Sequence, residues 1–153
     1  MTNSIIGSEM LQLVTFKLAG QKYAVDIRKV QEINVMKEIT RIPNAEPYIE
    51  GAVNLRGKVV PVLNLEKKFG FTDANVNGLA KIVIMDVNGV VIGVLVDSVS
   101  DVLRINRDMI DPPPSISSNV NTGYISGIAK LDDGLVIMLD MDKLINTTAI
   151  PQA

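Results

Sequence analysis

Cysteine and histidine are both absent from this chain of 153 residues. Without cysteine there is no disulfide, no zinc–thiolate site and no thiol nucleophile. Without histidine the chain lacks the commonest general base, the commonest transition-metal ligand and the base of a Ser-His-Asp triad. The two absences together argue against an enzyme before any motif is considered.

The chain also has no excess of positive charge and few aromatic side chains. Lys and Arg total 15 against 17 Asp and Glu, which gives a net charge of −2, and aromatic residues make up 4 % with no tryptophan. Nucleic-acid binding needs a basic face, and single strands also need aromatic platforms for base stacking. We therefore expect no nucleic-acid partner.

Long apolar runs do not occur. The longest run of apolar residues and glycine is 90–96, VVIGVLV, whereas a membrane-spanning helix needs about 20 such residues. The N-terminal residues lack the basic region and long apolar stretch of a signal peptide. The expectation is a soluble, cytoplasmic protein without direct membrane insertion.

Four acidic residues lie close together in the sequence near the C-terminus. Asp132 and Asp133 belong to the segment DDG, and Asp140 and Asp142 to the segment DMD. Carboxylates can bind a hard cation, but a turn followed by a helix cap accounts for the same residues. EF-hand spacing, G-x-G-x-x-G and the P-loop motif are all absent. We therefore expect no metal and no cofactor.

Valine and isoleucine dominate the chain, often at alternate positions as in a half-buried strand. Turn residues separate such segments, and Asn-Gly is the strongest short hairpin signal. The sequence therefore predicts four hairpins, whose turns are Ala19-Gly20-Gln21, Arg56-Gly57, Asn88-Gly89 and Asp132-Asp133-Gly134.

Helices are predicted to be few and short. Asp26 can cap a helical turn through Ile27, Val30 and Ile33, which are apolar at i, i+3 and i+6. Asn64 and Asp140 can each cap a short helix that follows a hairpin. Three methionines lie in strand or helix patterns and are interpreted as core residues: Met85, Met138 and Met141.

The chain matches itself at two offsets. Residues 13–33 align with 82–102 without a gap, and residues 51–67 align with 127–143 in the same way. The difference between the offsets is taken up by 111–123, DPPPSISSNVNTG, whose composition predicts a loop. Similar order in both copies favours one unit used twice, although alternation and turn glycines recur in any β protein.

This repeat predicts one domain over 1–153, made of two small β-lobes. Each lobe has about five strands, and a lobe of that size buries little surface alone. The two lobes are therefore expected to share one apolar core.

Five segments of the chain are distinctive in combination: YAVDIRKVQEI (23–33), ITRIP (39–43), GAVNLRGKVVPVLNL (51–65), VIGVLVDSVSDVL (91–103) and GYISGIAKLDDGLVIMLDMDKL (123–144). Through them the chain resembles the CheW-like family of bacterial chemotaxis coupling proteins, from about residue 10 to 146. The resemblance implies a mainly β fold of two SH3-like, five-stranded barrel subdomains around a shared apolar core, with a few short helices, and a non-enzymatic scaffold.

Partners and site residues follow from the resemblance alone. It implies binding to the regulatory domain of the histidine kinase CheA and to the cytoplasmic tips of chemoreceptors. Val30 and Glu32 fall at kinase-binding positions. Arg56 falls at a position tied to receptor coupling, and Val99 and Val102 fall in the region facing the receptor helix.

Several alternatives stay open at this point. Val30 also fits an ordinary core valine, and Arg56 also fits a solvated turn residue. Asn64 stands where the family often has aspartate, which is neutral for a cap but removes any charge contact. The chain could also serve another sensory array as a stand-alone paralogue, or be a nucleic-acid-binding barrel.

Overall fold

The computed structural model describes residues 10–35, 37–70, 81–113 and 123–145. These residues form eleven strands, two short α-helices and two 3-10 turns, so the fold is mainly β as predicted. The strands are β1 Met10–Leu18, β2 Gln21–Asp26, β3 Val30–Val35, β4 Ile49–Leu55, β5 Lys58–Asn64, β6 Lys81–Val87, β7 Val90–Val96, β8 Ser98–Asn106, β9 Ile110–Asp111, β10 Ile125–Leu131 and β11 Gly134–Leu139. The helical elements are η2 Ile27–Lys29, α1 Leu65–Lys68, η3 Arg107–Met109 and α2 Met141–Leu144.

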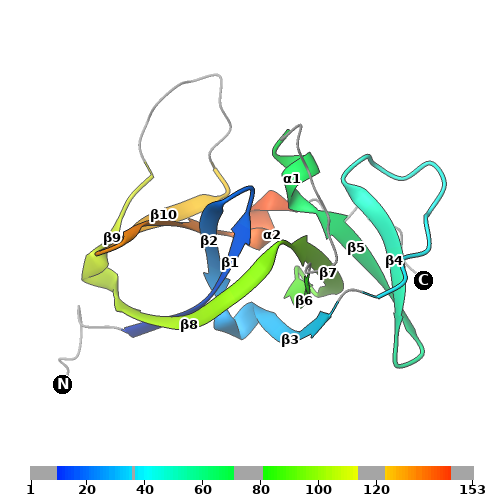
Figure 1. Cartoon of the computed structure of the whole chain (residues 1–153), viewed down its shortest axis with the longest axis horizontal. Coiled ribbons are helices and arrows are strands. Elements are labelled where there is room, and N and C mark those ends of the chain that lie inside the picture. The colour runs from blue at the N-terminus through cyan, green and yellow to red at the C-terminus, as the bar shows by residue number, and fades with distance from the viewer. Residues whose placement is uncertain (1–9, 36, 71–80, 114–122, 146–153) are drawn as a thin grey trace.

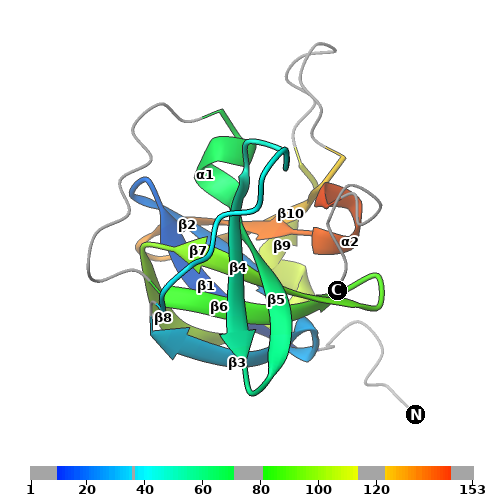
Figure 2. The same cartoon turned by 90° about the vertical axis from the view of Figure 1, so that its right-hand side faces the viewer.

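The strands form two sheets (Figures 1 and 2). Sheet A has the order β8-β1-β2-β11-β10-β9, and sheet B has the order β3-β6-β7-β5-β4. Neighbouring strands run antiparallel except for β2 with β11 and β5 with β7, which are parallel. Sheet B has the five strands expected of a lobe, and sheet A has five plus the two-residue β9.

All four predicted hairpins are present. At the β4–β5 turn, φ is +52° at Arg56 and +86° at Gly57, and the β6–β7 turn has +51° at Asn88 and +82° at Gly89. Two successive positive φ angles define the type I′ turn, whose twist matches that of the flanking strands. This explains why short sequence signals were sufficient to place these hairpins.

The helices after the hairpins also form as predicted. Asn64 caps α1 by accepting a hydrogen bond from the Lys67 N–H at 3.2 Å, and Asp140 caps α2 by accepting one from the Lys143 N–H at 3.2 Å. Neither α-helix in the described part of the chain is long and apolar enough to cross a membrane.

The predicted helical turn from Asp26 to Ile33 is wrong beyond its first three residues. Asp26 does cap η2, accepting from the Arg28 N–H at 2.9 Å. The chain then becomes β3, where Val30 pairs with Met85 of β6. Partly buried and exposed side chains alternate along β3. Such alternation is typical of a strand, and here the strand forms because it pairs with the buried β6. The apolar spacing of residues 27–33 gives no information about that neighbour.

Residues that match each other in the sequence repeat also have matching strand partners. Gly51 pairs with Val62 in the β4–β5 hairpin, and Gly127 pairs with Met138 in β10–β11, with a register shift just before each glycine. Val62 also pairs with Gly93 in the parallel β5–β7 pair, as Met138 does with Ala24 in β2–β11.

Each sheet nevertheless contains strands from both matched parts of the chain. Sheet A joins the β1–β2 hairpin to β8 and the β10–β11 hairpin, while sheet B is made of β3 to β7. The two matched parts are therefore interlocked, and neither forms a sheet by itself. The predicted loop at 111–123 begins in β9, and its residues 114–122 lie outside the described part of the chain.

Apolar side chains form three clusters. A central cluster takes residues from both sheets, including Phe16 and Met85, which are fully buried. This central cluster is the shared apolar core that the sequence predicts. Sheet B has its own cluster of Val53, Leu55, Val60, Val62, Ile82, Ile84 and Leu95. Sheet A has a smaller one of Leu13, Ala24, Ile105, Ala129 and Val136. The three predicted core methionines all contact these clusters.

Candidate functional site

Two of the predicted site residues are joined by an ion pair. Arg56, at the tip of the β4–β5 hairpin, donates from Nη1 and Nη2 to the two carboxylate oxygens of Glu32, at 3.2 and 2.5 Å. Glu32 lies on β3, which is one edge of sheet B, whereas β4 is the other edge. The pair therefore ties the hairpin tip to the far edge of the same sheet (Figure 2).

The surroundings keep both groups charged. The hydrogen bond from Arg56, reinforced by one from Asn34 Nδ2 at 3.1 Å, lowers the pKa of Glu32, and the same pair raises the pKa of Arg56. Of the side-chain surface, 70 % is exposed in Arg56 and 27 % in Glu32. A guanidinium fork in this position can also bind a carboxylate of another protein.

Large apolar side chains are exposed on the strands that carry this pair. They are Ile33 and Val35 on β3 and Val59 on β5, and Val35 is 62 % exposed. Neither Val35 nor Val59 is predicted as a site residue from the sequence. The available signal is weak, because an apolar residue at an outward strand position looks the same as one that faces a core.

The predicted valines divide into two kinds. Val30 and Val99 are partly buried and pack against the central cluster. Val30 therefore does have the core contacts of an ordinary valine. Val102, on β8, is 53 % exposed, and Ile33, at the matching position of β3, is 43 % exposed. Both β3 and β8 lie along the lower side of the molecule in Figure 1.

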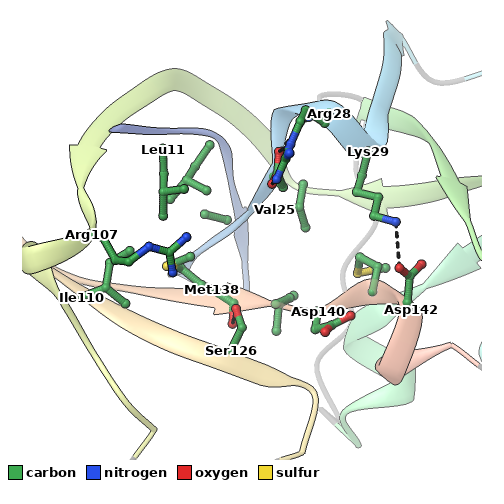
Figure 3. A pocket seen from close by; sticks show the side chains of 15 residues that line it. Leu11, Val25, Arg28, Lys29, Arg107, Ile110, Ser126, Met138, Asp140 and Asp142 are labelled. Carbon is green, nitrogen blue, oxygen red and sulfur yellow. Dashed lines mark hydrogen bonds and ion pairs between the residues drawn. The ribbon is translucent and has the colours of Figure 1, made fainter. Parts of the chain in front are cut away.

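A cavity of about 290 Å³ opens beside sheet A (Figure 3). Its walls combine apolar side chains such as Leu11 and Met138 with charged ones at the rim. Two of the rim cations are engaged, because Arg28 pairs with Asp26 at 2.7 Å and Lys29 with Asp142 at 2.7 Å.

Three of the four acidic residues near the C-terminus have structural partners. Asp133 pairs with Lys22 at 3.7 Å, Asp140 caps α2, and Asp142 binds Lys29. Across the described residues, no group of three or more His, Cys, Asp or Glu side chains is placed to hold a metal ion.

The family model of the CheW-like domain matches residues 12–149, which is most of the chain. The chain belongs to the CheW-like domain family. It is 34 % identical over 142 residues to the chemotaxis protein CheW of Klebsiella aerogenes, covering 93 % of this chain and 84 % of that protein. It is 31 % identical over 146 residues to the chemotaxis protein CheW of Treponema pallidum, covering 93 % and 86 %.

The structures agree with the sequence comparison. The crystal structure of the scaffolding protein TtCheW from Thermoanaerobacter tengcongensis matches with a TM-score of 0.83 and 35 % identity, covering 92 % of this chain and 96 % of that chain. The mainly β architecture of two sheets therefore matches that of a CheW scaffolding protein.

Proposed function

We propose that this chain is a non-enzymatic scaffold that links chemoreceptor tips to the histidine kinase CheA and supports receptor control of kinase activity. Membership of the CheW-like family over nearly the whole chain carries the proposal. The scaffolding role named for the structural relative supports it. Recruitment to receptor arrays at the membrane follows from this role.

The kinase contact is assigned to the edge of sheet B that carries β3. Glu32 supplies a charged anchor there, and the exposed apolar side chains of Ile33 and Val35 supply surface that a partner can bury. Protein interfaces commonly combine an apolar centre with a polar rim. Val30 contributes from beneath, because it packs on the core and supports β3.

The receptor contact is assigned to the outer face of β8. Val99 and Val102 lie on β8, and Val102 is the exposed member of the two. An amphipathic receptor helix can place its apolar side chains against such a surface. Arg56 is bound to Glu32 of β3, so it is suited to connect receptor binding with the kinase contact.

The Glu32–Arg56 ion pair is the proposed link between the receptor contact and the kinase contact. In the free protein Arg56 is held by Glu32, so a partner that binds either side chain competes with the other. Control of the kinase then requires different affinities for the two receptor–kinase states, because equal affinities shift no equilibrium.

The decisive experiment is co-sedimentation of the purified chain with CheA and a receptor cytoplasmic fragment from the same organism. We predict that Glu32→Lys weakens recruitment of CheA, because it places a cation against Arg56 and removes the anchor. We predict that Arg56→Ala leaves kinase recruitment largely intact but impairs receptor control of kinase activity. Asp132→Ala, at the matching tip of the β10–β11 hairpin, is the control and leaves both unchanged.

A charge exchange separates a contact role from a structural one. Glu32→Arg combined with Arg56→Glu restores an ion pair between the same positions. If the two residues only brace sheet B, the double variant regains activity, and the assigned contacts are wrong. Failure of the unmodified chain to recruit CheA would overturn the proposed function itself. Circular dichroism must show folded protein in every variant.

A further inference from the structure

Two hairpin turns are anchored to the two α-helices by the same kind of contact. The Ala19 N–H, in the β1–β2 turn, donates to Glu66 Oε1 of α1 at 3.2 Å. The Asn88 N–H, in the β6–β7 turn, donates to Asp142 Oδ1 of α2 at 3.0 Å. Both the turns and the acids occupy matching positions in the sequence repeat. The molecule therefore contains the same anchor twice.

The third group at each anchor differs in charge. At the Asp142 anchor it is Lys29, whose Nζ lies 2.7 Å from Asp142 Oδ2 (Figure 3). At the Glu66 anchor it is Asp97, whose Oδ2 accepts a second hydrogen bond from the same Ala19 N–H at 3.0 Å. One anchor thus pairs an anion with a cation, and the other places two carboxyl groups on one donor.

These arrangements shift the pKa values of the two acids in opposite directions. The hydrogen bond from Lys29 lowers the pKa of Asp142. Burial, followed by the hydrogen bond and charge of Asp97, raises the pKa of Glu66. Glu66 is only 4 % exposed. A like charge beside a buried carboxyl group disfavours its ionised form.

The other charged groups around Glu66 do not relieve this repulsion. Tyr23, from β2, adds only a phenol. The neighbouring lysines on α1 are engaged elsewhere, since Lys67 pairs with Glu50 at 2.6 Å and Lys68 lies 4.4 Å above the Tyr48 ring. Lys17 of β1 contributes its backbone carbonyl, which accepts from the Asp97 N–H at 3.0 Å.

We propose that Glu66, Asp97 and the Ala19 N–H form a proton-dependent latch between the two sheets. Asp97 lies where the chain passes from β7 of sheet B to β8 of sheet A, Glu66 follows β5 of sheet B, and Ala19 belongs to sheet A. When Glu66 is protonated, both side chains hold the turn through the Ala19 N–H. When Glu66 is ionised, its charge is repelled by Asp97 and the latch loosens.

The pH dependence has a defined sign. An acid whose pKa is higher in the folded state binds more protons there than in the unfolded chain. Its stabilising contribution is complete below the unfolded pKa and is lost as pH rises through the folded pKa. Asp142 has the opposite dependence, since its contribution is lost as pH falls.

The test is urea unfolding of the full chain from about pH 5 to about pH 8.5, a window that begins just above the ordinary glutamate pKa, from which the pKa of Glu66 is raised. Glu66→Gln keeps an oxygen for the Ala19 N–H and can donate to Asp97. We expect this variant to raise the urea midpoint of unfolding at the alkaline end. It should also remove the decrease of the midpoint with rising pH that is expected of the unmodified chain. Asp142→Asn, the control at the twin anchor, should lower the midpoint throughout this range.

Amide hydrogen exchange, measured first on the unmodified chain, gives a second readout. After correction for intrinsic exchange, protection of the Ala19 amide should fall as pH rises, while protection of the Asn88 amide stays constant. Asp97→Asn should abolish the difference. Parallel behaviour of the two amides, or the same alkaline fall in Glu66→Gln as in the unmodified chain, would overturn the latch.

Discussion

At the scale of single residues, Asn64 shows how a polar side chain can meet two demands at once. Its Oδ1 caps α1, and its Nδ2 donates to Glu50 Oε1 at 3.2 Å while the residue is 3 % exposed. An aspartate at this position could provide only the cap. The amide therefore suits a chain that has a carboxylate at position 50.

We predict that Asn64→Asp destabilises the fold by about 1–3 kcal/mol, because it removes a buried donor and brings two carboxylates together. Urea unfolding at neutral pH measures the change. Adding Glu50→Gln supplies a donor from the other side and should recover most of the loss. An unchanged midpoint in Asn64→Asp would show that the Asn64–Glu50 contact contributes nothing.

At the scale of elements, two bulges depend on glycine because another segment crosses them closely. A Cβ at Gly51 would lie 2.1 Å from the backbone oxygen of Thr40, and one at Gly127 would lie 2.5 Å from Ile110 Cγ2. Thr40 bridges to Ala52 and β9 pairs with β10 at the matching place. These two positions require glycine because another segment passes too close to admit a Cβ, and not only because of the backbone conformation of the bulge.

Gly51→Ala is therefore predicted to cost about 3 kcal/mol or more, since backbone must move to admit the methyl group. Gly57→Ala is the control. It also has a positive φ, but nothing lies within 4 Å of its Cβ, so only the turn strain of about 1 kcal/mol is expected. Thermal unfolding followed by circular dichroism compares them, and equal losses would contradict the steric argument.

Prediction from sequence succeeded for elements whose causes are local. A two-residue Asn88-Gly89 turn carries its own backbone preference, and Asn64 and Asp140 cap helices within three residues of themselves. Prediction failed at β3, where the apolar spacing of Ile27, Val30 and Ile33 fits a helical turn but pairing with β6 decides the structure.

The candidate site was less predictable, because its geometry joins residues that are distant in sequence. Family resemblance placed Glu32 and Arg56 among the site residues, but their ion pair depends on how sheet B curves. Glu66 and Asp97 carry no sequence signal of proximity. Their meeting depends on the path of the chain between the sheets, which only the three-dimensional structure gives.

At the scale of the whole molecule, the central cluster makes the two sheets interdependent. Leu63 is fully buried in this cluster and pairs with strands on both sides, Ile49 of β4 and Val94 of β7. Phe16 of sheet A is buried in the same cluster. A substitution that weakens packing of one sheet against the cluster should therefore destabilise the other sheet as well.

We predict that Leu63→Ala lowers the free energy of unfolding by about 2–5 kcal/mol and reduces amide protection equally in both sheets. Val59→Ala, on the same strand but exposed, should change stability by about 0.5 kcal/mol or less. Hydrogen exchange measured by nuclear magnetic resonance gives both results. Loss of protection confined to sheet B would show that the sheets unfold separately.

The parallel pairing of β2 with β11 has a consequence for the order of events during synthesis. Tyr23 pairs with Ile137, so the β1–β2 hairpin leaves the ribosome long before its neighbour is translated. Sheet B is contained within residues 30–96 and can assemble as soon as β7 emerges. The β1–β2 hairpin therefore lacks this neighbour after sheet B has formed, and the apolar face that packs there must stay covered or chaperoned until residues 134–139 are translated.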